Sequence, residues 1–199
     1  NRGVAPEDFE SYLSCDINTL NAPWKFKDME KAADILTEKI LQKKHIRVIG
    51  DYDIDGVCST YILTDGIKHL GGNADMDIPD RVKDGYGINK NIIDRAISDG
   101  TDTIITCDNG IAAIEEIQYA RDNGITVIVT DHHQVPSDEN GNPIRVNGNA
   151  TINQHQPDCS YPFKSLCGAV VAMKLMIALY EKMNISYDLE KQDNRKKRT

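Results

Sequence analysis

The stretch Ile125-Thr126-Val127-Ile128-Val129-Thr130-Asp131-His132-His133 decides the fold. Its first part is a short apolar run of mostly β-branched residues, which is typical of a buried strand. It ends in one aspartate and two histidines. Two other apolar runs also end in acids: residues 47–50 lead into Asp51-Tyr52-Asp53-Ile54-Asp55-Gly56, and Thr103–Cys107 leads into Asp108-Asn109-Gly110. The sequence therefore predicts three buried strands, each followed by carboxylates.

Strand-like and helix-like segments alternate along the chain, and glycines at 71, 72, 100 and 124 follow the helical patterns. This alternation favours an α/β fold, with a parallel β-sheet flanked by crossover helices. The predicted strands cover residues 46–49, 74–78, 103–107, 126–130 and 150–153. The predicted helices cover 29–41, 57–69, 91–98, 112–122 and 168–183, with Asp28 as the cap of the first.

Three regions differ in composition. Residues 1–27 are a lead-in segment in which Phe9, Leu13, Leu20 and Trp24 are expected to pack on the domain. Residues 28–185 form the domain itself, with a polar loop over 134–148. Residues 186–199 are highly charged, and we expect a tail or a truncated linker there.

Composition limits the classes of function. The chain has 199 residues and a formal net charge of −8, which argues weakly against a general basic surface for nucleic acid. No apolar run approaches the ~18–20 residues of a membrane span, and no signal peptide opens the chain. The five cysteines form no C-x-x-C pair, so a reduced, cytoplasmic setting is expected, with Cys58 and Cys107 as core residues.

The carboxyl ends of parallel strands meet at one edge of a sheet and form its ligand crevice. Several acids gathered there repel one another unless a cation neutralises them. We therefore predict a divalent-metal site whose ligands come from Asp51, Asp53, Asp55, Asp108 and at least one of the histidines at 132 and 133, the other of which could ligate or contact a phosphate or water. Carboxylate and imidazole ligands without thiolate favour Mn²⁺, with Mg²⁺ close behind. Two such ions roughly 3.5–4 Å apart would suit phosphoryl hydrolysis.

Other classes of site are excluded by their motifs. Neither the serine nucleophile elbow G-x-S-x-G nor the P-loop G-x-x-x-x-G-K occurs. An EF-hand loop counted from Asp51 would need Glu at its twelfth position, where the chain has Ile62.

Three motifs carry a family resemblance. Residues 48–57, 108–111 and 131–133 resemble the first three motifs of the DHH phosphoesterase superfamily. Within it, residues 78–87, 152–164 and 166–172 resemble the RecJ family of single-strand-specific DNA exonucleases. The resemblance extends from residue 1 to about residue 185.

The resemblance implies a metal-dependent phosphodiesterase that degrades single-stranded DNA in the 5′→3′ direction, in DNA repair and recombination. By this resemblance, Asp53, Asp55 and His132 are metal ligands and Asp108 bridges two Mn²⁺ or Mg²⁺ ions. His133 contacts the phosphate, and Asp51 is a further participant. The implied substrate contacts are Arg81, Tyr86 and Asn109.

Two departures from the family pattern leave alternatives open. Ile49 stands where many members have histidine, and the family's fourth motif, Gly-Thr-x-x-Asp, does not occur. The family's second domain and the OB-type domain are also missing, so we expect a catalytic domain cut from a longer protein, with weak metal binding and little activity alone. The alternatives are a DHH phosphoesterase for short RNA, cyclic dinucleotides or pyrophosphate, and a non-catalytic binding module.

Overall fold

The sheet is parallel and five-stranded, as predicted. The computed structural model describes residues 4–14, 20–81, 85 and 87–186. The strand order is β2-β1-β3-β4-β5, and each neighbouring pair is parallel. The strands are β1 (His45–Ile49), β2 (Asn73–Asp77), β3 (Thr103–Cys107), β4 (Thr126–Thr130) and β5 (Ala150–Ile152).

The strand order fixes where a ligand site can form. The chain first adds β2 on one side of β1, and then adds β3, β4 and β5 on the other side. The order therefore reverses between β1 and β3, and this topological switch point opens a crevice at the carboxyl ends of these strands. The acidic segments after β1 and β3 lie on the two sides of that crevice.

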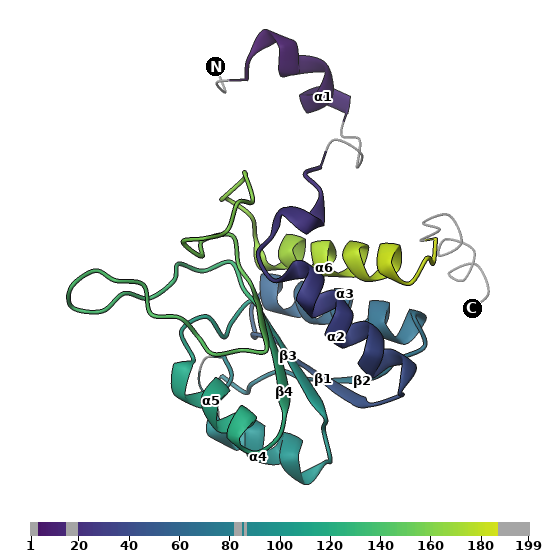
Figure 1. Cartoon of the computed structure of the whole chain (residues 1–199), viewed down its shortest axis with the longest axis vertical. Helices are drawn as coiled ribbons and strands as arrows, with labels where there is room; N and C mark the ends of the chain where they lie inside the picture. Colours follow the sequence, from purple (N-terminus) through teal and green to yellow (C-terminus); the bar gives the residue numbers. More distant parts are fainter. Residues whose placement is uncertain (1–3, 15–19, 82–84, 86, 187–199) are drawn as a thin grey trace.

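Helices cover both faces of the sheet (Figure 1). Alternate strand residues point to opposite faces, so Val48 packs with the helices of one face and Ile49 with those of the other. The first face carries α2 (Met29–Leu41), α3 (Ile54–His69) and α6 (Gly168–Lys182), and the second carries α4 (Lys90–Ser98) and α5 (Ile114–Asp122). The site is thus held between two separate apolar cores.

Close packing of α3 on α6 aligns the starts of both helices at the acidic edge. A Cβ atom at Gly66 would lie 2.6 Å from Cε of Met176, so a larger residue there would require the Met176 side chain to move. Both helices begin at the carboxyl edge of the sheet. There, Asp55 in the first turn of α3 accepts hydrogen bonds from the amides of Gly168 and Ala169, at the start of α6.

The lead-in segment differs from the prediction. It contains η1 (Pro6–Asp8), α1 (Phe9–Ser14) and η3 (Pro23–Lys25). The side chains expected to pack are exposed instead: Phe9 51%, Leu13 74%, Leu20 45% and Trp24 41%. Phe26 is the buried anchor and stacks on Tyr161, with ring centroids 4.0 Å apart. Apolar character predicted burial, but Phe9, Leu13 and Leu20 are largely exposed, whereas Trp24 is partly covered and its Nε1 donates to Glu181 of α6 at 2.6 Å.

Three smaller predictions also need correction. Asp28 stands at the N-cap position of α2 as predicted, but its side chain does not bond the helix: its backbone is left-handed (φ 59°) and its Oδ2 accepts from the Thr151 amide at 3.1 Å. Cys58 is exposed rather than in the core, whereas Cys107 is buried as predicted. Helix α3 starts at residue 54, three residues earlier than predicted, because Asp53 caps it.

The predicted charged tail, from 187 onward, lies outside the described residues. None of the helices in the described part of the chain is long and apolar enough to span a membrane.

Candidate metal centre at the carboxyl edge of the sheet

The first acidic segment turns sharply from β1 into α3. A Cβ atom at Gly56 would lie 2.5 Å from the carbonyl oxygen of Asp51, so the turn can close only around glycine. Asp53 caps the helix, and its Oδ1 accepts from the Gly56 amide at 2.9 Å. This cap fixes one oxygen of an exposed carboxylate.

Asp51 is the buried carboxylate of this segment, with 2% of its surface exposed. Burial raises its pKa, and the nearby Asp53 carboxylate adds to the effect. Its Oδ1 accepts no hydrogen bond from the described residues. Oxygens of Asp51, Asp53 and Asp108 lie within 4.8 Å of one another, which is close enough to share a cation.

Asp108 follows β3 in a left-handed backbone conformation (φ 61°) and is 2% exposed. Burial, followed by the charges of Asp55 and Asp53, raises its pKa to about 7. Helix α6 starts against it, since a Cβ atom at Gly168 would lie 2.8 Å from Asp108 Oδ1. Burial and the neighbouring carboxylates make the negative charge of Asp108 costly, and a bound divalent cation would stabilise it.

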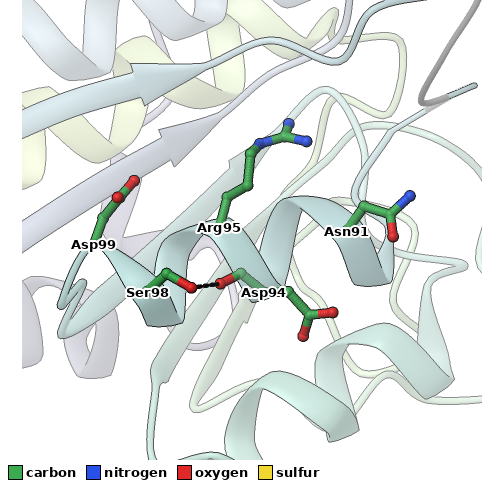
Figure 2. A pocket seen from close by; sticks show the side chains of 5 residues that line it. All are labelled: Asn91, Asp94, Arg95, Ser98 and Asp99. Carbon is green, nitrogen blue, oxygen red and sulfur yellow. Dashed lines mark hydrogen bonds between the residues drawn. The ribbon is translucent and has the colours of Figure 1, made fainter.

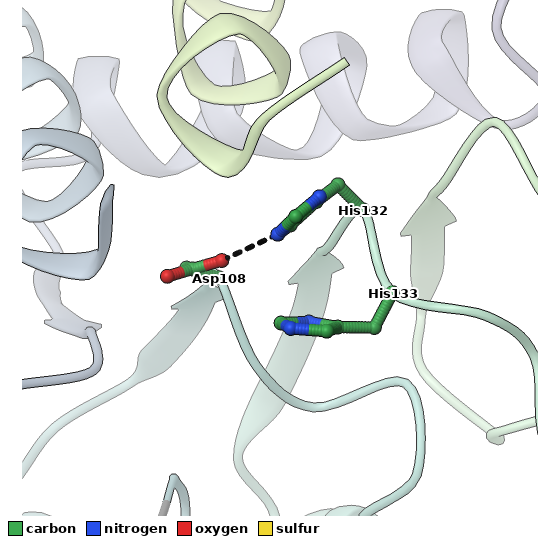
Figure 3. Close-up of side chains that lie close together, drawn as sticks. All are labelled: Asp108, His132 and His133. Carbon is green, nitrogen blue, oxygen red and sulfur yellow. Dashed lines mark ion pairs between the residues drawn. The ribbon is translucent and has the colours of Figure 1, made fainter. Parts of the chain in front are cut away.

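His132 presents one ring nitrogen to this acidic group. Its Nδ1 lies 3.0 Å from the carbonyl oxygen of Leu166, which can only accept, so Nδ1 carries the proton. In the neutral ring, Nε2 then bears the lone pair, and it lies 3.0 Å from Asp108 Oδ1 and 3.6 Å from Asp55 Oδ2 (Figure 3). A backbone carbonyl that orients the ring in this way is the usual support of a metal-ligating histidine.

His133 is held by a carboxylate that sequence reasoning did not select. Asp131 is 1% exposed, and its Oδ1 lies 2.7 Å from Nδ1 of His133. This contact raises the pKa of His133. The same carboxylate accepts from the backbone amides of His132, His133 and Ile111. Asp131 therefore holds the ring of His133 and the backbone of His132, and the two ring centroids are 4.3 Å apart.

Both predicted histidines gather with Asp108. One ligand atom of each of Asp108, His132 and His133 lies within 4.8 Å of the other two. Figure 3 shows both rings projecting from the end of β4 toward the carboxylate at the end of β3. The geometry thus joins the ends of β1, β3 and β4 in one cluster that could hold a divalent cation.

Asp55 links two helices in the structure. Its Oδ2 accepts from the Gly168 amide at 2.7 Å, and its Oδ1 accepts from the Ala169 amide at 2.8 Å. Negative charge is stabilised at the N-terminus of α6 by the helix dipole. Each carboxylate oxygen has a second lone pair, so the ligand role of Asp55 stays a prediction.

The predicted substrate contacts have different surroundings. Asn109 is 2% exposed, and its amide bonds the carbonyls of Ile49 and Cys107 and the amide of Ile88. It joins β1, β3 and a loop beneath the site, and its substrate contact stays a prediction. The Arg81 guanidinium is exposed and lies 5.3 Å from the centre of the ring of Tyr52, beside Asp51. Tyr86 lies outside the described residues.

Two hollows in the surface are relevant to the site. A cavity of about 630 Å³ adjoins His133 and Asp131, between the loop that follows Asp108 and the start of α5. A second hollow of about 370 Å³ lies along α4 and is lined by polar and charged side chains (Figure 2). The second hollow shares no residue with the metal cluster, so only the first belongs to the site.

Residues 45–195 match the model of the DHH family, N-terminal domain. The chain belongs to the DHH family. Over 157 residues it is 41% identical to the single-stranded-DNA-specific exonuclease RecJ of Bacillus subtilis. The aligned region covers 79% of this chain and 19% of that protein. Over 159 residues it is 40% identical to RecJ of Escherichia coli, and that aligned region covers 79% of this chain and 26% of the relative.

Solved structures agree with this family. A crystal structure of exonuclease RecJ bound to manganese matches with a TM-score of 0.73 and 33% identity, over 84% of this chain and 41% of that one. RecJ from Thermus thermophilus in complex with Mn²⁺ matches with a TM-score of 0.67 and 32% identity, over 86% of this chain and 23% of that one. The chain thus spans about a fifth to a quarter of the two curated relatives it matches here.

Proposed function

We propose that this chain is the DHH domain of a RecJ-like exonuclease that hydrolyses phosphodiester bonds of single-stranded DNA from the 5′ end. The observation that carries the proposal is the cluster of Asp51, Asp53, Asp108, His132 and His133 at the ends of three neighbouring strands. Its relatives of 40–41% identity are single-stranded-DNA-specific exonucleases. Polarity and substrate rest on the family resemblance.

The donor set fits Mn²⁺ or Mg²⁺. Asp51, Asp53 and Asp108 supply oxygens, and His132 supplies Nε2, which suits a hard or borderline divalent ion. The unsatisfied buried Oδ1 of Asp51 and the raised pKa of Asp108 are the signs of a cation site. When bound, a pair of divalent ions supplies Lewis-acid activation of water and of the phosphoryl group.

The chain's own residues would then orient the substrate. Asp131 bonds Nδ1 of His133 and holds the ring beside the cluster, where the second ring nitrogen would contact a phosphate oxygen. Arg81 is exposed on the loop after β2 and can pair with a second phosphate. Leu166 and Asp131 restrict the two imidazoles to one orientation each, so little rotamer entropy is lost when substrate binds.

Two further expectations extend this proposal. The site is completed by segments of the full-length protein beyond this chain, which covers 19% and 26% of two relatives. The protein works in the cytoplasm, in DNA repair and recombination. Both are inferences from the family.

The test is digestion of a 5′-phosphorylated single-stranded oligonucleotide by the full-length protein with Mn²⁺. Mononucleotides should be released from the 5′ end. Asp108→Asn should reduce the rate at least about tenfold, as expected when a ligand of the site is changed. The control Asp122→Asn, on the exposed surface of α5, should retain the wild-type rate.

Other outcomes point to the alternatives. Turnover of dinucleotides, cyclic dinucleotides or pyrophosphate, with the oligonucleotide left intact, would replace the proposal with a small-substrate phosphoesterase. Mn²⁺ binding without turnover of any of these substrates would favour a non-catalytic module.

A further inference from the structure

The cavity beside His133 is part of the same edge but is not used by the metal cluster. It has a volume of about 630 Å³, within the ~300–1,000 Å³ range of small-molecule sites. His133 belongs both to the cluster and to the cavity lining, and Asp131, which holds His133, also lines the cavity. A ligand with one end at the cluster could therefore place its other end in this cavity.

The cavity walls are fixed from behind by two buried polar side chains. Asp131 Oδ2 accepts from the Ile111 amide at 2.9 Å, which holds the wall formed by the loop after β3. Asn109 Oδ1 accepts from the Ile88 amide at 3.3 Å, which holds the wall formed by the loop before α4. Walls tied in this way are pre-organised, and pre-organisation lowers the entropic cost of binding.

The chemistry of the lining selects a class of ligand. Ile88, Ile111, Ala112 and Ala113 give the cavity mainly apolar walls. The polar groups at its rim are the Glu116 carboxylate and the side-chain amide of Gln134. A carboxylate repels a phosphate, whereas it accepts hydrogen bonds from the N–H groups of a heterocycle. Apolar walls with a few polar groups suit a planar, neutral, hydrogen-bonding ring.

We propose that this cavity binds the base of the nucleotide whose phosphate lies at the metal cluster. The inference rests on the proposed function, because it assumes a nucleic-acid substrate at that cluster. Contact with the apolar walls would be sequence-tolerant, since every base has an apolar face. Glu116 would favour bases that present an amino group.

The test uses the full-length protein with Mn²⁺ and two 5′-phosphorylated trinucleotides. One has a base on its 5′-terminal nucleotide, and the other is abasic at that position. Ala112→Trp fills the cavity from an exposed position of its wall. Ser98→Trp, in the hollow on α4, is the matched control. Wild type and Ser98→Trp should have a kcat/KM about tenfold higher for the intact substrate, and Ala112→Trp should bring the ratio to about one.

A parallel arm measures binding of the same trinucleotides in EDTA, where hydrolysis does not occur. Base-dependent binding without turnover would refute the exonuclease function but support the cavity as a base site. Equal affinity and equal turnover for both substrates in the wild type would overturn the inference. A base preference that persists in Ala112→Trp would also overturn it. Gln134→Trp, at another position of the lining, replaces Ala112→Trp if that variant is unfolded.

Discussion

Replacing Asn109 with leucine tests whether this side chain builds the site or contacts the substrate. The amide donates to the carbonyl oxygens of Ile49 at 3.2 Å and Cys107 at 2.9 Å, and it accepts from the Ile88 amide at 3.3 Å. Leucine has a similar size but makes none of these bonds. Because the site is 2% exposed, water cannot replace them without opening the structure.

The expected loss follows from those three bonds. A buried hydrogen bond contributes about 0.5–1.5 kcal/mol, and a buried partner left unsatisfied costs about 1–3 kcal/mol. Burial of the apolar leucine side chain offsets part of this loss. We therefore expect Asn109→Leu to lower the free energy of unfolding by about 3 kcal/mol. For a chain of this size, that lowers Tm by about 6–12 °C.

The assay is urea unfolding of the 199-residue chain, followed by circular dichroism. The control Asn91→Leu, on the exposed surface of α4, should stay within about 0.5 kcal/mol of the wild type. A loss below about 1 kcal/mol for Asn109→Leu would refute the positioning role. A raised KM in the full-length enzyme at unchanged stability would instead support the substrate contact predicted from the sequence.

Three further outcomes can be measured directly. Gly168→Val should weaken Mn²⁺ binding by about 10–100-fold in calorimetry, since its Cβ would lie 2.8 Å from Asp108 Oδ1. Contact with Lys27 lowers the pKa of Asp158 to about 2, so the ionised carboxylate stabilises the fold. The wild type should therefore be slightly more stable than Asp158→Asn at neutral pH. This difference in the free energy of unfolding should vanish as the pH falls toward 2. Burial raises the pKa of the Cys107 thiol to about 12, so iodoacetamide at pH 8 should alkylate exposed cysteines and spare Cys107 in mass spectra of the native chain.

Local sequence patterns were sufficient for the elements of the sheet. Strands β3 and β4 have the predicted bounds at both ends, because a β-branched apolar run between polar residues defines a buried strand. The meeting of the acidic ends followed from parallel topology, which places all carboxyl ends at one edge. These features depend on chain periodicity and connection rules, which a single sequence contains.

Long-range contacts could not be read in the same way. Gly168 donates to Asp55 across 113 positions of sequence, and no local pattern marks that pair. The support role of Asp131 was also missed, although a carboxylate directly before two histidines was visible. Its burial and its bond to the Ile111 amide depend on how the loop after β3 folds back. Burial of Phe9 and Leu13 was predicted from their hydrophobicity, yet both side chains are exposed. Hydrophobicity indicates a preference for burial, but it does not show whether another part of the chain covers the side chain.

The structure divides the acidic residues of this edge into two groups with different roles. Asp131 and Asp55 have their oxygens bonded to backbone amides, so the protein itself stabilises their charges. Asp51 and Asp108 are equally buried, and burial raises their pKa values although the backbone of Tyr52 and Gly87 bonds to Asp51 and the charge of His133 acts on both. Burying two poorly compensated carboxylates is costly unless a cation joins them. Asp108 is the carboxylate shared by the Asp51 group and by His132, and this is the physical reason for placing the metal beside Asp108.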